Sequence, residues 1–300
     1  MKRQIPLIAA VVVLVAATIP LAHVGAAPSP NRVTILYDSF GNNPKLKLDW
    51  GYAALVEYGG KRILFDTGNN ASIFEGNVKA LGVDLRKIDF VVISHRHADH
   101  TSGLNYLFSI NPKVKVYVPD EPWGLFARGV SNDFYRKDPD LPAEMRYYNG
   151  KPPEILEAGT PWPNGNFVPI SKTTEVVPGA FIIPGVSTTP GTLELHELSL
   201  ALKGPKGIVL VVGCSHPGVD NIVKAAEQID PHVTIMFGGF HHVKADDAEV
   251  ERLATALRDD LKVERVAPGH CTGEPEFKAL KKSFGDRYVY AGLGSVVDLP

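Results

Sequence analysis

The sequence has few of the features that would assign it to a specialised class. Cysteine occurs only twice in 300 residues, too few to fix a disulfide framework. The formal net charge is only −2, so no general electrostatic attraction to nucleic acid or anionic membranes is expected. The chain also lacks low-complexity segments and repeats at solenoid periods. What remains, at 44% hydrophobic and 21% charged residues, is typical of a globular chain with a large core.

The N-terminal segment differs in composition from the rest of the chain. Lys2 and Arg3 precede an uncharged, apolar run over residues 5–22, which is followed by Gly25-Ala26-Ala27. A basic start, an apolar centre and a small-residue exit predict a secretory signal peptide over residues 1–27, cleaved after Ala27. The run is also long enough to span a bilayer, so an uncleaved membrane anchor is the alternative. In either case we expect the protein to be exported, as a periplasmic or secreted protein.

Residues 28–300 are expected to form a single domain, because α/β folds often reach about 200–250 residues as one unit. Residues 121–180 are rich in Pro, Gly, Trp and Tyr and show no long periodic pattern. We interpret this range as a cap-like insertion, since long structureless segments in compact domains are usually functional or disordered. Its aromatic residues either line a pocket or pack the insertion onto the core.

One short motif combines three imidazoles and a carboxylate. The sequence His95-Arg96-His97-Ala98-Asp99-His100 follows an apolar run at residues 88–93 that is typical of a buried strand. His95 and His97 are two residues apart, so an extended backbone points both to the same side. Asp99 and His100 lie where the chain turns toward a helix and can face a second ion. Four metal-type ligands in six positions favour a metal site over a polar loop.

The second half of the chain contains three further histidines that follow expected strands. His216, His241 and His270 each follow an apolar strand and a glycine-bearing turn. We expect His216 to complete a ligand set with the first histidines of the motif, although His196 competes for this place. His270 is expected to join the second half of the motif. His241 is interpreted as a substrate contact or as a residue that supports the ligands.

These ligands predict a hydrolytic site with two metal ions. A zinc ion takes about four ligands and a hydrolytic site leaves one position for water. Two ions bridged by one hydroxide would share a substrate oxygen, and Asp99 is the candidate catalytic group that accepts a proton. Zinc is expected, with manganese or iron as alternatives. The six expected ligands are His95, His97, Asp99, His100, His216 and His270.

Two further residues have open roles at this site. Asp66 follows an apolar strand and precedes Thr67-Gly68, so it either orients a metal-ligating histidine or caps the next helix. Cys214 lies two residues before His216 and is either a thiolate ligand or, as the sequence slightly favours, a small buried apolar residue. A disulfide between Cys214 and Cys271 is a further alternative, although both cysteines lie in polar, His-containing motifs.

With these residues in place, the sequence resembles the metallo-β-lactamase superfamily. The resemblance rests on Asp66 in its strand-Asp-Thr-Gly turn, on the motif from His95 to His100 and on the later strand-end histidines. It implies an α/β fold of the αββα type, with two facing mixed sheets, helices outside and a two-metal site along one sheet edge. The superfamily usually has a metal-bridging aspartate where this chain has Gly213-Cys214.

Three motifs resemble a narrower group within that superfamily. They are Gly213-Cys214-Ser215-His216, Gly238-Gly239-Phe240-His241 and His270-Cys271-Thr272-Gly273. The group is named for 7,8-dihydropterin-6-methyl-4-(β-D-ribofuranosyl)aminobenzene 5′-phosphate synthase. We expect an exported binuclear hydrolase acting on a phosphoester or a related small molecule. The alternatives are a lactonase or β-lactam hydrolase and, from another class, a non-catalytic zinc-binding or sensor protein.

Overall fold

The computed structural model describes residues 1, 31–121, 126, 130–133, 135–156, 161–187 and 194–300. The expected signal peptide, residues 1–27, therefore lies outside the described residues except for Met1, and it stays a prediction. Among the residues described, none of the helices is both long and apolar enough to span a membrane.

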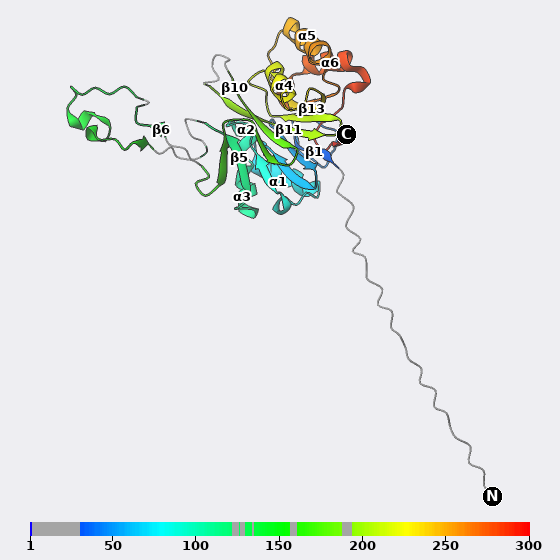
Figure 1. Ribbon diagram of the computed structural model, residues 1–300, viewed down its shortest axis with the longest axis horizontal. Coiled ribbons are helices and arrows are strands. Elements are labelled where there is room, and N and C mark those ends of the chain that lie inside the picture. The colour runs from blue at the N-terminus through cyan, green and yellow to red at the C-terminus, as the bar shows by residue number, and fades with distance from the viewer. Residues whose placement is uncertain (2–30, 122–125, 127–129, 134, 157–160, 188–193) are drawn as a thin grey trace.

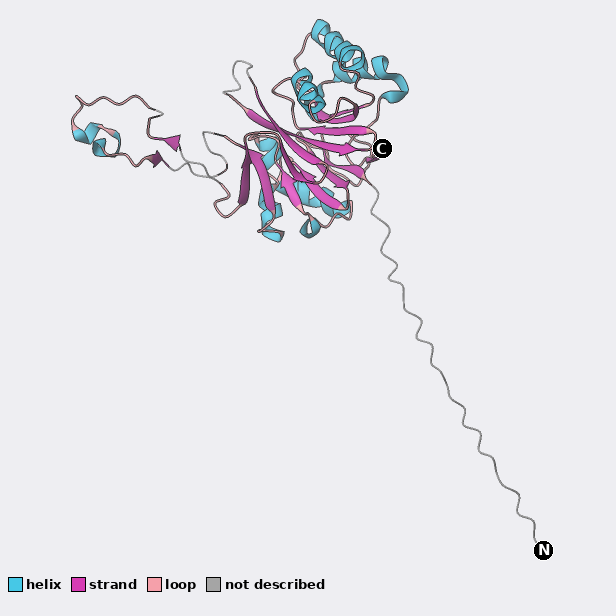
Figure 2. Cartoon of the chain, viewed as in Figure 1, coloured by secondary structure: helices cyan, strands magenta, loops and turns pink. Residues whose placement is uncertain are grey.

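Two mixed β-sheets form the body of the molecule (Figures 1 and 2). In the first, the strand order is β15 (Val296–Asp298), β1 (Arg32–Tyr37), β2 (Ala53–Tyr58), β3 (Lys61–Phe65), β4 (Phe90–Val92), β5 (Lys115–Pro119) and β8 (Asn166–Ile170). In the second, it is β14 (Val266–Gly269), β13 (Val233–Gly239), β12 (Gly207–Val212), β11 (His196–Gly204), β10 (Ala180–Val186) and β9 (Thr174–Val177). The α-helices are α1 (Ala71–Ala80), α2 (Ala98–Thr101), α3 (Leu104–Ile110), α4 (Val219–Glu227), α5 (Asp247–Thr255) and α6 (Glu274–Phe284).

Each sheet buries both of its faces. In β12, Val209 and Val211 pack into a core shared with the first sheet, while Leu210 and Val212 pack against the outer layer formed by α4, α5 and α6. A strand covered on both sides needs apolar residues at successive positions, which explains the unbroken run in β12. Helices α1 and α3 cover the outer face of the first sheet in the same way. The structure thus confirms the expected sandwich of two facing mixed sheets with helices outside.

Local signals in the sequence set the ends of the helices beside the site. The Asn70 side chain accepts hydrogen bonds from the backbone N–H groups of Ser72 and Ile73, which caps the N-terminus of α1. The helix ends before Gly82, whose φ of +68° suits glycine. Helix α5 is capped by Asp246 and continued by a π-helical turn at Ala256–Asp260.

Residues 121–180 contribute to three separate parts of the structure. Strands β8 and β9 pair at the edges of the two main sheets, whereas β6 (Val130–Ser131) and β7 (Ile155–Leu156) pair with each other. The part that carries β6 extends away from the sheets in Figure 1. Among its aromatic residues, Trp162 packs on the core and donates a 2.8 Å hydrogen bond to Asn105, while Tyr147 and Tyr148 are exposed. A cap over the site stays a prediction.

Candidate metal centre

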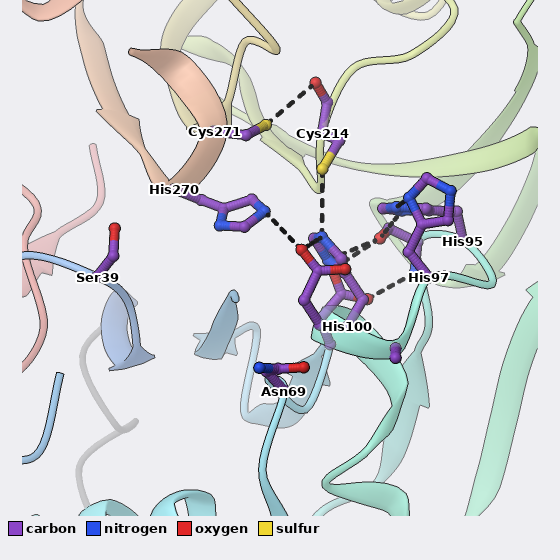
Figure 3. Close-up of polar contacts among 12 residues, drawn as sticks. Ser39, Asn69, His95, His97, His100, Cys214, His270 and Cys271 are labelled. Atoms are coloured by element: carbon purple, nitrogen blue, oxygen red, sulfur yellow. Dashed lines mark hydrogen bonds and ion pairs between the residues drawn. The ribbon is translucent and has the colours of Figure 1, made fainter. Parts of the chain in front are cut away.

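The residues expected to form the site come together at the carboxyl ends of strands from both sheets. Asp66 follows β3, the motif at residues 94–100 follows β4, and the later motifs follow β12, β13 and β14. Strands β3 and β4 run parallel, as do β12, β13 and β14. Parallel strands end at the same edge of a sheet, so the loops that follow them are held side by side. Figure 3 shows the resulting cluster of imidazoles and sulfur atoms.

His95, His97 and His216 form the first group of ligands. The ring of His95 lies 4.6 Å from that of His97 and 4.7 Å from that of His216, measured between centroids. A nitrogen of His95 approaches one of His97 to 3.0 Å. His95 and His216 are both buried. This arrangement directs several imidazole nitrogens into a small volume, as a tetrahedral metal site requires.

Asp99, His100 and His270 form the second group. Asp99 Oδ2 lies 3.4 Å from Nε2 of His270 and 3.8 Å from Nε2 of His100. The two rings are 4.9 Å apart. The His270 side chain is only 1% exposed, yet neither ring nitrogen has a hydrogen-bond partner within the described part of the chain. Buried polar atoms without partners are rare, and a metal ion beside His270 would account for these.

Asp66 orients His100 from behind. Its carboxylate accepts a 2.7 Å hydrogen bond from Nδ1 of His100 and two more, each 2.7 Å, from the backbone N–H and the hydroxyl of Ser94. The bond to Nδ1 leaves Nε2 of His100 facing the cluster. This is the geometry by which a carboxylate fixes the tautomer of a ligating histidine. Asn70, and not Asp66, caps the following helix.

Sequence reasoning missed Glu197, which supports the first group. Its buried carboxylate accepts hydrogen bonds from the backbone N–H groups of Cys214, Ser215 and His216, at 2.7–2.8 Å. It also pairs with Nδ1 of His216 at 2.9 Å, which leaves Nε2 of that ring free for the cluster. An acidic residue in the apolar strand β11 was the available signal, because buried charges need partners.

Sequence reasoning also missed Asp38, whose carboxylate holds the backbone of His270 in the second group. It is fully buried at the end of β1 and accepts hydrogen bonds from the backbone N–H of His270, at 3.0 Å to Oδ2, and of Ser39, at 2.7 Å. Burial raises the pKa of Asp38 to about 7, against the opposing effect of His270. Like Asp66, it directly follows an apolar strand, and that shared position was the signal in the sequence.

Backbone strain is concentrated at this site. Asp66, Ser215, His241 and His270 all have positive φ values, of 56°, 67°, 55° and 46°. A non-glycine residue in this region costs of order 1–3 kcal/mol and persists where the surrounding structure imposes it. The backbone conformation at these strand-end turns therefore lowers the stability of the fold, but it sets the direction in which these side chains point.

The remaining candidates lie around the two groups. His241 is exposed, and its ring is 4.3 Å from that of His216, on the open side of the cluster. His196 begins β11 and belongs to none of the potential ligand groups among the described residues. Cys214 and Cys271 are both buried and free, so the structure contains no disulfide between them. Cys214 Sγ lies 3.2 Å from Nε2 of His100.

The protonation states of most residues in the metal-free cluster suit cation binding. Burial and the neighbouring His216 lower the pKa of His97 to about 4, and burial lowers that of His95 further. Burial opposes the charge on Asp99, but His270 and His100 hold its pKa well below the usual range. For His100, the Asp66 carboxylate outweighs burial and raises the pKa to about 9. Neutral imidazoles and an ionised carboxylate are the forms that bind divalent ions, so His95, His97 and Asp99 are ready to bind, whereas His100 must release a proton when a metal ion binds.

Nitrogen, oxygen and sulfur donors therefore converge in a buried, partly unpartnered cluster. His270 has two orphaned nitrogens, and the donor set of imidazole, carboxylate and thiol matches the preferences of zinc and neighbouring transition metals. The residues present fit divalent metal ions. Bound there, such ions would bind the substrate and polarise it as Lewis acids.

Comparison with known proteins identifies the family of the chain. The family model described as the metallo-beta-lactamase superfamily matches residues 49–270. The chain is 26% identical to the 7,8-dihydropterin-6-methyl-4-(beta-D-ribofuranosyl)-aminobenzene-5′-phosphate synthase of Methanocaldococcus jannaschii, over 92% of this chain and 99% of that protein. An uncharacterized protein of the same organism is 29% identical over 83% of this chain and 93% of its own length.

A solved structure extends the comparison to three dimensions. Tm1679, described as a metal-dependent hydrolase of the beta-lactamase superfamily, shares 27% identity and superposes with a TM-score of 0.67. The match covers 90% of this chain and 99% of that one. The family model spans most of the chain and includes both groups of ligands. The protein therefore belongs to the metallo-β-lactamase superfamily.

Proposed function

We propose that this protein is an exported, binuclear metal-dependent hydrolase that cleaves a phosphoester of a small molecule. The observation that carries the proposal is the pair of ligand groups, one with His95, His97 and His216 and the other with Asp99, His100 and His270. Imidazole rings within each group lie 4.6–5.0 Å apart, and the ring of His95 lies 4.2 Å from that of His100 in the other group. Two metal sites about 3.5–4 Å apart are typical of enzymes that stabilise both the attacking and the leaving oxygen.

In this proposal, different residues orient the ligands, accept a proton and contact the substrate. Asp66 and Glu197 hold His100 and His216 so that Nε2 of each ring faces the cluster. Asp99 is partly exposed, at 19% of its side chain, and ionised, so it can accept a proton on the open side. His241, which is exposed beside His216, is our candidate for a substrate contact.

A phosphate-bearing substrate is favoured by the relative from M. jannaschii, whose named product carries a 5′-phosphate. That relative is named as a synthase, so the reaction of this chain must be measured directly. We expect the protein loaded with zinc or manganese to hydrolyse bis(p-nitrophenyl) phosphate, and to lose this activity on chelation and regain it on reloading. A lactone and nitrocefin, tested in parallel, report the acyl-transfer alternatives.

Each outcome of this panel is informative. Turnover of the lactone or nitrocefin alone would replace the phosphoester assignment with an acyl hydrolase. Stoichiometric metal binding without turnover of any ester would support a zinc-binding or sensor protein instead. Chelated protein serves as the matched control, because it has the same chain and lacks only the ions.

The proposal of export rests on the N-terminal sequence. The basic start, the apolar run at residues 5–22 and the small-residue exit favour processing after Ala27. We expect the mature protein, expressed at full length in a bacterial host, to begin at Pro28 and to appear in the periplasmic or secreted fraction. N-terminal sequencing and fractionation test this. An intact N-terminus in the membrane fraction would show an uncleaved anchor, and one in the cytoplasm would overturn export.

A further inference from the structure

One sulfur atom belongs to both groups of ligands. The ligand atoms of His95, His216 and Cys214 lie within 4.8 Å of one another, and so do those of His100, His270 and Cys214. These two sets share no histidine. Among the described residues, Sγ of Cys214 is therefore the common member of these two sets, and it also belongs to a third set with His241 and Cys271.

The loop that carries Cys214 is built to hold the sulfur at this point. The Cys214 backbone N–H donates to Oε1 of Glu197 at 2.8 Å, and the Ser215 hydroxyl donates to the carbonyl of Gly239 at 2.7 Å. Gly213 lies so close to Ser94 that a Cβ atom there would come within 2.2 Å of the Ser94 hydroxyl. A larger residue at 213 would push the loop away from the motif that follows β4, and the sulfur away from His95 and His100.

A second observation points to a ligand at the same place. Both ring nitrogens of His270 are buried and have no hydrogen-bond partner among the described residues. Cys214 is itself only 3% exposed, and its sulfur lies 3.2 Å from Nε2 of His100. A buried sulfur surrounded by imidazole nitrogens, some of them unpaired, matches the environment of a metal-bound thiolate better than that of an inert apolar residue.

We propose that the Cys214 thiolate is a shared ligand of both metal ions. The proposal rests on the binuclear centre proposed above. A sulfur has lone pairs enough to bind two ions at once, and a coordinating thiol gives up its proton to solvent when the metal binds. Cys214 thus takes the place between the ions that a carboxylate occupies in other members of the superfamily. Because thiolate is a soft ligand, the centre prefers zinc or cobalt(II) to manganese.

Cobalt(II) substitution tests the proposal without relying on activity. We expect the reduced wild-type protein to bind two cobalt ions and to show a sulfur-to-cobalt charge-transfer band in the near ultraviolet. Cys214→Ser should lose the band completely. Cys214→Asp should also lack it but keep two ions, since a carboxylate can bridge them, and should bind manganese more tightly relative to cobalt than the wild type does. This second variant also serves if Cys214→Ser fails to fold.

Cys271 provides the matched control. It is buried beside Cys214, and its thiol donates a 3.8 Å hydrogen bond to the Cys214 carbonyl. It lies with Cys214 and His241 in a third set of potential ligands, but it belongs to neither of the two sets that the proposal joins. Cys271→Ser should therefore keep the charge-transfer band. Two bound cobalt ions without the band, or a band that survives in Cys214→Asp or disappears in Cys271→Ser, would overturn the shared thiolate and leave the binuclear hydrolase standing. Failure to bind cobalt at all would overturn both.

Discussion

Replacing His270 with glutamine is expected to lower the metal content from two ions to one per chain and to reduce hydrolysis more than about 100-fold. Loss of a residue that merely orients a ligand costs about 10–100-fold in metal affinity or activity, so loss of a ligand should exceed that range. The remaining His95, His97 and His216 keep the first ion. Metal analysis after gel filtration and steady-state kinetics measure the two effects.

The fold should survive this change. The imidazole of His270 makes no hydrogen bond within the described residues, and the polar contact that the variant alters is the 3.4 Å approach to the partly exposed Asp99. His232→Gln is the matched control, because His232 is a half-exposed histidine paired with Glu264 on the surface. It should retain both ions and full activity. Two ions and near-normal turnover in His270→Gln would show that His270 is not a ligand.

Glu197→Gln is expected to destabilise the metal-free protein by about 3 kcal/mol, because removing one member of a buried ionic network leaves its partners uncompensated. The Glu197 carboxylate serves three backbone N–H groups and the His216 ring. A glutamine keeps one acceptor oxygen and turns an N–H₂ group toward donors. Urea unfolding of the metal-free protein measures the loss in the free energy of unfolding.

The same variant should also weaken the first metal ion. The glutamine has one neutral oxygen where the carboxylate has two charged ones, so it holds the tautomer of His216 less firmly, and we expect about a 10–100-fold loss of metal affinity. Glu57→Gln is the control: Glu57 is buried and paired with Arg32 and Arg62 on the first sheet, away from the site. It should lower stability without changing metal affinity. Equal metal affinities in both variants would refute the role of Glu197 in positioning His216.

Much of the site could be predicted because its signals are local. The motif from His95 to His100 lies within six positions and directly follows a strand, so its direction and spacing are set by neighbouring residues. His216 and His270 also follow apolar strands. The structure brings these residues and the other expected ligands into one cluster. The sandwich of two sheets was likewise expected, from the resemblance that the motifs carry.

The supporting carboxylates and the place of the sulfur could not be predicted in this way. Glu197 lies 17 residues from Cys214 along the chain, and Asp38 lies 232 residues from His270. Their positions within or directly after an apolar strand are the only signal in the sequence, and their partners could not be named because hydrogen bonds between distant segments are properties of the folded chain. For the same reason, the sequence did not decide whether Cys214 is a metal ligand or a small buried apolar residue.

The sequence by itself determined which chemical groups this protein has for its site and at which strand ends they stand, because strand periodicity and motif spacing are local properties. Only the tertiary structure decided which of those groups contact one another. In the folded chain the two sheets face each other, and their strand ends lie side by side at the site. Carboxylates from distant segments bind His100 and His216, and the Cys214 sulfur lies between two sets of histidines. The physical reason is that these relations depend on contacts between segments far apart in the chain, which the packing of the sheets alone brings together.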